Sequence, residues 1–216
     1  MASVSDICNM ALSHVGSDTV VTSITPPDGS VEAGYCARFY PIARTEGLED
    51  NAWTWSKTRV ELATVANPSA VWLYAYALPS DCLIAKRVLQ KSTIFDYVVW
   101  PFTSVVTADE LQFWTERGSA DFEIENGVIL TNEPEAVLLY TRDIRDTTKF
   151  STGFVVYLSY LLAAYLAGPI LKGQPGAQAS AAFRQAADRM KARASTHDAN
   201  QSAERAEHVP EFIRRR

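Results

Sequence analysis

Apolar residues recur every three or four positions at the start of the chain and predict an amphipathic helix over residues 3–16. The apolar face of this helix consists of Val4, Ile7, Cys8, Ala11 and Val15. Ser3 is placed to cap the first turn, with Asp6 three residues later. Gly16 is placed to end the helix, and a loop is expected over 17–29.

A second apolar stripe predicts a helix that begins near Ser30 and continues toward Trp53. The stripe consists of Val31, Tyr35, Phe39, Ile42 and Leu48. Pro41 lies inside it and is expected to kink the helix, because proline removes one backbone donor. One or two further helical turns are expected over 60–63.

The period then changes from helical to alternating. Strands are predicted at 83–89, 95–100, 110–115, 120–125, 127–131 and 136–141. The Asn126-Gly127 pair favours a type I′ turn, so residues 120–131 should form a tight hairpin. Phe122 and Ile124 alternate with polar residues, as a strand with one buried face requires.

Helical spacing returns at 151–171 and again at 177–195, and residues 196–216 lose all periodicity. The pattern predicts an α+β fold, a helical bundle with an inserted antiparallel β subdomain and an extended C-terminal arm. The predicted parts are a helical subdomain at 1–66 and 148–195, the β subdomain at 67–147 and the arm at 196–216.

The segment from Phe150 to Leu171 contains no charged residue over 22 positions. That is long enough to span a bilayer. However, it contains Gly168, Pro169 and three tyrosines, and one lysine flanks each end, so no positive-inside bias exists. A packing helix is the favoured interpretation, with more apolar surface than one chain easily covers. An oligomer interface would cover the remainder.

Composition places the 216-residue chain among ordinary globular proteins, with 47% apolar residues and a net charge of −5. The charge is uneven, with −9 over 1–149 and +4 over 150–216. An acidic protein of this kind is not a general DNA binder. Its three cysteines, Cys8, Cys36 and Cys82, show no CxxC spacing and predict neither a disulfide framework nor a metal site.

Catalytic motifs are absent from the sequence, and no cofactor is expected. His14 is expected to be an ordinary surface or packing residue. Glu123 and Glu125 would share one strand face, and such a carboxylate pair leaves a cell-wall (peptidoglycan) hydrolase as an alternative. A membrane-associated protein anchored through 150–171 is the other alternative.

Aromatic residues gather near the predicted junction of the helical and β subdomains. The residues expected to pack there are Trp53, Trp55, Trp72, Tyr76 and Pro79. Lysine and arginine are scarce in this region, so packing is favoured over the stacking of nucleic-acid bases.

The C-terminal arm combines an apolar patch at 209–213 with a terminal Arg214-Arg215-Arg216. An apolar anchor beside arginines on a long segment is suited to docking onto a protein by folding on binding.

Three blocks of the sequence resemble the head-to-tail adaptor (connector) proteins of tailed bacteriophages, the family that includes the podovirus tail tubular proteins. The first block contains Phe-Tyr-Pro-Ile-Ala-Arg at 39–44 and Trp-Thr-Trp-Ser-Lys-Thr-Arg at 53–59. The second is Trp-Leu-Tyr-Ala-Tyr-Ala-Leu-Pro-Ser-Asp-Cys at 72–82. The third runs from Ile-Leu-Thr-Asn at 129–132 to the Leu-Ala-rich segment at 161–167.

This resemblance implies a non-enzymatic virion protein located in the neck of the particle and assembled in the host cytoplasm. Such adaptors form rings, usually of twelve copies, between the portal protein and the downstream tail or nozzle protein. Genomic DNA passes through the ring, and an acidic lumen would not hold it. The C-terminal region of such adaptors engages the portal. The residues expected to do so here are Arg184, Arg189, Arg193, Phe212, Ile213, Arg214, Arg215 and Arg216.

Overall fold

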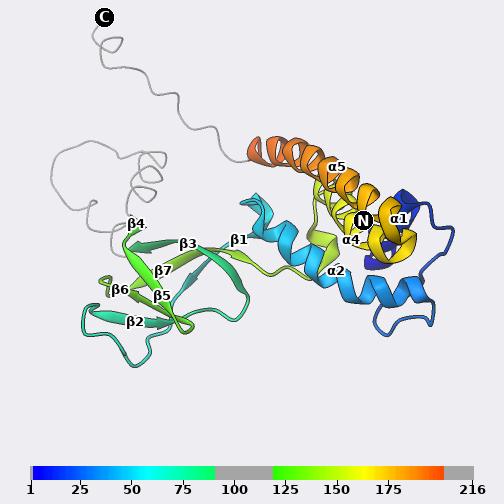
Figure 1. The fold of residues 1–216 in the computed structure, drawn as a ribbon. Coiled ribbons are helices and arrows are strands. Elements are labelled where there is room, and N and C mark those ends of the chain that lie inside the picture. The colour runs from blue at the N-terminus through cyan, green and yellow to red at the C-terminus, as the bar shows by residue number, and fades with distance from the viewer. Residues whose placement is uncertain (1, 91–118, 202–216) are drawn as a thin grey trace, which may run out of the picture. The chain divides into compact units, whose positions relative to one another are not determined.

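The computed structural model describes residues 2–90 and 119–201 and divides the chain into two compact units. A helical unit consists of Met1–Trp55 together with Ile144–Arg216, and a β unit consists of Ser56–Asp143. The β unit is inserted in sequence between the two parts of the helical unit (Figure 1). The α+β class predicted from the sequence is therefore confirmed.

The helical unit is built around α4 (Thr152–Leu171). Three helices pack against α4, namely α1 (Val4–Val15), α2 (Val31–Glu49) and α5 (Gly173–Ala199). The short η3 turn (Thr147–Lys149) leads into α4, and η1 (Thr54–Ser56) follows α2. Figure 1 shows α5 running alongside α4 over most of its length.

α1 begins and ends at the residues that the sequence marked. The Ser3 hydroxyl accepts a hydrogen bond from the Asp6 amide at 3.1 Å, and the Asp6 carboxylate accepts one from the Ser3 amide at 2.8 Å. These bonds hold the pKa of Asp6 below its usual value. Gly16 closes the helix in the left-handed conformation, with φ at 82°. The predicted capping box and glycine stop are confirmed.

α2 continues through Pro41 as one helix, and the kink expected there stays a prediction. Pro41 is exposed, so water can reach the carbonyl group that loses its amide partner. Further along α2, Gly47 allows close approach to α4. A Cβ at this position would lie 3.3 Å from the rings of Phe154 and Tyr157. A larger residue here would therefore force one of these rings to move by a few tenths of an ångström.

α4 contains the uncharged segment that the sequence could place in a membrane, a core or an interface. It is the one helix among the described residues with the length and hydropathy to cross a membrane, and 61% of its most apolar stretch is buried. Its larger buried side chains are Phe154, Val155, Tyr157, Leu158, Leu161, Leu162 and Leu166. α1, α2 and α5 cover most of this surface, and the oligomer interface expected to cover the remainder stays a prediction.

The β unit contains two antiparallel sheets. One has the order β1-β7-β3-β4 and the other β2-β6-β5. The strands are β1 (Lys57–Glu61), β2 (Tyr74–Ala77), β3 (Cys82–Gln90), β4 (Ser119–Ala120), β5 (Phe122–Glu125), β6 (Val128–Thr131) and β7 (Ala136–Arg142). One apolar cluster draws from both sheets and consists of Tyr76, Val88, Ile129, Ala136, Leu138 and Tyr140. The two sheets therefore share a core.

The hairpin predicted from Asn126-Gly127 is present. β5 and β6 pair in antiparallel register, with Glu125 opposite Val128. Asn126 and Gly127 both have positive φ, at 48° and 78°, which is the conformation that a type I′ turn needs.

The predicted boundaries between the two parts of the chain are corrected by the structure. Residues 57–61 form an edge strand paired with β7, whereas a helical turn was expected around Val60. The β unit therefore begins at Ser56 rather than at residue 67, and the helical unit resumes at Ile144 rather than at residue 148. The strands predicted at 95–100 and 110–115 lie outside the described residues.

Candidate functional site

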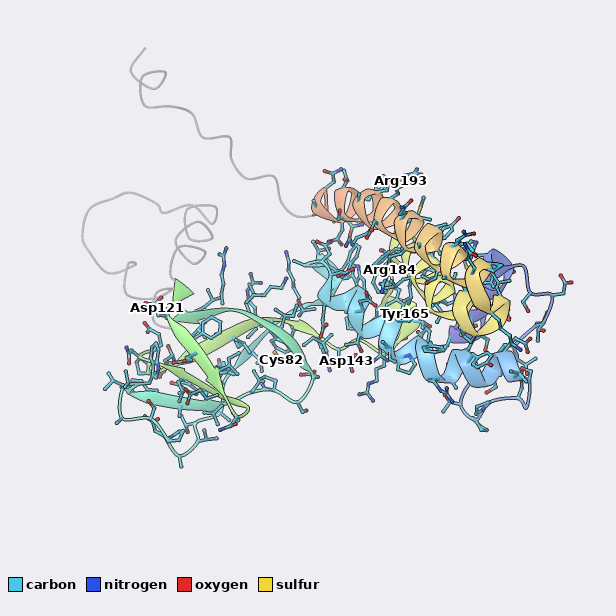
Figure 2. All side chains as sticks on the ribbon, in the orientation of Figure 1. Cys82, Asp121, Asp143, Tyr165, Arg184 and Arg193 are labelled. Carbon is cyan, nitrogen blue, oxygen red and sulfur yellow. The ribbon has the colours of Figure 1, made fainter. Side chains whose placement is uncertain are left out.

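Arg184 on α5 is held by groups from its own chain. Its guanidinium forms an ion pair with Glu46 on α2 and lies over the ring of Tyr165, 5.2 Å from the ring centre. The Tyr165 hydroxyl donates to the same carboxylate at 2.5 Å. Burial and this bond raise the pKa of Tyr165. Arg184 was predicted to contact the portal, and the structure gives it an internal role that joins α2, α4 and α5 (Figure 2).

A second junction of the same kind lies further along α2. Asp50 accepts a hydrogen bond from the Tyr157 hydroxyl of α4 at 2.5 Å. It also forms an ion pair with Lys191 of α5 at 3.3 Å. Burial and the bond to Asp50 raise the pKa of Tyr157. The two carboxylates are four residues apart on α2 and the two cations seven residues apart on α5, so each set lies on one helix face.

A third junction completes the row. Asp198 on α5 accepts two hydrogen bonds from Thr54, one from its amide and one from its hydroxyl, both at 2.7 Å. We call the three junctions at Glu46, Asp50 and Thr54 the helix ladder. The ladder fixes one face of α5 against α2 and leaves the opposite face of α5 open.

Arg189 and Arg193 lie on that open face of α5. They follow Arg184 by five and nine residues, which rotates them by about 140° and 180° around the helix axis. Both are exposed, and neither forms an ion pair within residues 2–90 and 119–201. Figure 2 shows Arg193 on the outer side of α5. These two of the three arginines predicted on α5 are thus available to a partner.

The predicted start of the C-terminal arm is corrected. Residues 196–199 belong to α5, and Asp198 among them is 5% exposed and part of the helix ladder. The sequence pattern did not predict this last turn, because it contains no large apolar residue that would continue the helical spacing. The other residues expected to bind the portal, Phe212, Ile213, Arg214, Arg215 and Arg216, lie outside the described residues.

The residues expected to pack at one junction divide between the two units. Trp53 is fully buried in the helical unit, where its ring meets Phe154 edge-on and its indole donates to the Gly47 carbonyl at 2.8 Å. Trp55 packs beside it against Phe150 and Phe154.

In the β unit, Tyr76 lies in the core and donates to the Glu133 carbonyl at 2.7 Å. Trp72 lies on the surface of the sheet β2-β6-β5 and donates to Glu123 at 3.2 Å. The carbonyl of Pro79 accepts from the Cys82 amide in the turn before β3. The sequence identified these residues as packing residues but placed them in one cluster, because position along the chain does not show which core a side chain enters.

A shallow open groove on the helical unit was not predicted. Its volume is about 540 Å³, and its walls are Pro41, Ile42, Thr45, Glu46, Glu49 and Tyr165. Ile42 is half exposed beside the two carboxylates. The groove is suited to an apolar side chain with a cation next to it. The sequence placed Ile42 in the apolar stripe of this helix, and its exposure could not be foreseen from that pattern.

Glu123 and Glu125 share one face of β5, as predicted, opposite Leu130 and Val128 of β6. Both side chains are exposed on the strand surface. A glycosidase needs its acid and base to enclose a sugar ring from two sides. Adjacent positions on one exposed strand do not enclose a substrate, so the geometry gives no support to the hydrolase alternative.

His14 packs inside the helical unit. Its ring stacks on Tyr160 of α4 with 4.0 Å between ring centres, and its Nε2 lies 3.2 Å from the Ser159 hydroxyl. Burial lowers the pKa of His14. Ser159 is fully buried and donates to the Val156 carbonyl, so the pair is a packing contact rather than a nucleophile with its base. The described residues contain no cluster of three or more metal-ligating side chains.

Comparison with protein-family models and with curated proteins gives no match for this chain.

Proposed function

We propose that this protein is a structural adaptor of a tailed bacteriophage, forming a ring that joins the portal to the tail and through which genomic DNA passes. The observation that carries the proposal is the insertion of an antiparallel β unit between the two parts of a helical unit. This is the architecture that the sequence resemblance implies. The three blocks of the resemblance contribute to both units.

The surface chemistry supports a binding role rather than catalysis. The polar groups that come together in the helical unit form the helix ladder, which fixes helices to one another. The exposed charges include two cations on the open face of α5, Arg189 and Arg193, and two carboxylates on β5, Glu123 and Glu125. Such charges steer and orient protein partners.

The test is capture of the portal protein encoded by the same genome. Purified full-length chain immobilised on a surface is expected to bind the portal, and images of the complex are expected to show a ring of copies on the portal axis. Absence of binding at micromolar concentrations of both proteins would overturn the proposal.

Two truncations test the contribution of the C-terminal arm. A chain that ends at residue 201 keeps the helix ladder, so it is expected to fold normally and bind the portal more weakly. A chain that ends at residue 195 loses Asp198 and is expected to be less stable as well. The first truncation therefore separates loss of the arm from loss of folding. Unchanged portal affinity of that truncation would remove the arm from the proposal.

A further inference from the structure

β1 and β5 each have an unpaired edge in the part of the chain that the structure describes. Within residues 2–90 and 119–201, β1 pairs only with β7 and β5 only with β6, so each is the outer strand of its sheet. An unpaired edge presents backbone amide and carbonyl groups that another strand can bind. Most of β1 and β5 is exposed. Both edges are therefore able to accept a further strand.

The two edges carry opposite charges with the same spacing. Lys57 and Arg59 are two residues apart on one face of β1, opposite Thr141 and Leu139 of β7. Neither cation forms an ion pair within the described residues. Glu123 and Glu125 are likewise two residues apart on one face of β5.

The next residues along each strand differ between the two rows. Asp121 continues the acidic row at the next alternate position (Figure 2), and Trp72 donates one hydrogen bond to Glu123. On β1 the row ends at Glu61, which interacts within its own chain. Because strands repeat every two residues, the rows Lys57–Arg59 and Glu123–Glu125 match in spacing.

The opposite faces of the two edges match as well. Val60 of β1 and Ile124 of β5 are 36% and 43% exposed, and each lies on the face opposite the charges. When Lys57 and Arg59 stand opposite Glu123 and Glu125, Ile124 stands opposite Thr58, and in an antiparallel pair Val60 stands opposite Phe122. The apolar side chains of both strands therefore share the other face of the pairing.

A third cation increases the positive charge near β1. Lys86 lies at the irregularity between Ala85 and Arg87 where β3 pairs with β7. Burial and the charge of Lys57 lower the pKa of Lys86. Carboxylates placed beside these lysines would relieve the repulsion between them.

We propose that β1 of one copy pairs with β5 of the next copy, so that Lys57 and Arg59 meet Glu123 and Glu125 across the joint. The proposal rests on the proposed function, because it assigns the contact between neighbouring adaptor subunits. Antiparallel pairing of β1 with β1 would place Arg59 against Arg59, and pairing of β5 with β5 would oppose carboxylates at every charged position. The head-to-tail pairing opposes unlike charges at both positions of each row, and head-to-tail contacts produce rings when they close.

The contact is small, since each strand has four or five residues. Free chains are therefore expected to associate only near about 0.1–1 mM. On a portal, tethering raises the effective concentration of neighbouring copies into the millimolar range. The small contact between β1 and β5 is then sufficient to join neighbouring copies that are already bound to the portal.

Charge reversal of the full-length chain tests the joint. The variant Lys57→Glu with Arg59→Glu has two acidic edges, and Glu123→Lys with Glu125→Lys has two basic edges. Sedimentation equilibrium at 50 mM NaCl, up to about 1 mM protein, is expected to show association of each variant weakened at least tenfold. A mixture of the two variants is expected to associate as the natural chain does. The variant with all four changes is expected to associate with itself but not with the natural chain.

Two matched controls carry the same charge changes elsewhere on exposed positions. They are Arg38→Glu with Lys149→Glu and Asp18→Lys with Glu135→Lys, and both are expected to associate like the natural chain. No association of the natural chain by 1 mM, equal effects of controls and edge variants, or no recovery in the mixture would each overturn the joint. Portal capture that persists in those cases would leave the adaptor function standing, while loss of capture by the natural chain would overturn the function itself.

Discussion

Thr54 and Asp198 are joined by two hydrogen bonds of 2.7 Å although 144 residues separate them in the sequence. Thr54 lies next to the point where the chain leaves the helical unit, and Asp198 lies in the last turn of α5. This junction therefore fixes the end of the first part of the helical unit to the last turn of α5. The other two junctions of the helix ladder continue the same contact along α2.

Asp198→Ala is expected to lower the free energy of unfolding by about 2–3 kcal/mol. The substitution removes a buried charged acceptor and leaves the Thr54 amide and hydroxyl without their partner. Asp188→Ala is the matched control, because its carboxylate is 65% exposed and forms only a 3.7 Å ion pair with Lys191. Urea unfolding of both variants measures the difference. Equal losses would show that the Thr54 contact contributes nothing specific.

Tyr157 and Asp50 are expected to be coupled by about 1 kcal/mol. Tyr157→Phe removes the hydroxyl that donates to Asp50, and Asp50→Asn removes the charge that accepts it. If the bond stabilises the fold, the double variant loses less than the sum of the two single losses. Unfolding free energies of the four proteins give the coupling. Tyr160→Phe is a control on the same helix, and additive losses at Tyr157 and Asp50 would contradict the prediction.

Acidification below neutral pH is expected to destabilise the helical unit through His14. Its pKa is lowered in the folded chain, so the unfolded chain binds the proton more readily. The stability that neutral His14 contributes is complete above the unfolded pKa of about 6.5 and is lost as the pH falls through that value and below the folded pKa. Urea unfolding at pH 7.5 and pH 5.5 should show a smaller loss in His14→Asn than in the natural chain. An identical loss in both would contradict the role of His14.

Arg189→Glu with Arg193→Glu is expected to weaken portal capture at least tenfold without changing the melting temperature. Both side chains lie on the open face of α5, away from the helix ladder. Arg38→Glu with Lys149→Glu makes the same charge change at other exposed positions and serves as the control. Capture assays at two salt concentrations measure the effect. Equal binding by both double variants would exclude α5 from the portal contact.

The sequence pattern predicted correctly those features that depend on interactions within a single helix or turn. Ser3, Asp6 and Gly16 define α1 through hydrogen bonds within four residues, and Asn126-Gly127 defines the hairpin through backbone conformation alone. The run at 150–171 was recognisable as a packing helix from its own residues too, since Gly168, Pro169 and three tyrosines interrupt its apolar character. These features depend on neighbouring residues, so the sequence pattern shows them directly.

The features that the sequence pattern missed depend on contacts between residues far apart in the sequence. β1 is a strand because β7, about eighty residues later, provides its ladder of hydrogen bonds. The helix ladder depends on which faces of α2 and α5 meet, and no spacing within either helix reveals that. The last turn of α5 is held by Thr54 rather than by apolar residues of its own. Tertiary context outweighs local preference at each of these positions.

The insertion of the β unit has a consequence for synthesis on the ribosome. α1 and α2 leave the exit tunnel first, yet the helix that covers their apolar faces, α4, is encoded after the whole β unit. The β unit, in contrast, is continuous in sequence and has all its strands available once β7 has emerged. The apolar faces of α1 and α2 therefore stay uncovered while the β unit folds, and the bundle closes only after α4 has emerged.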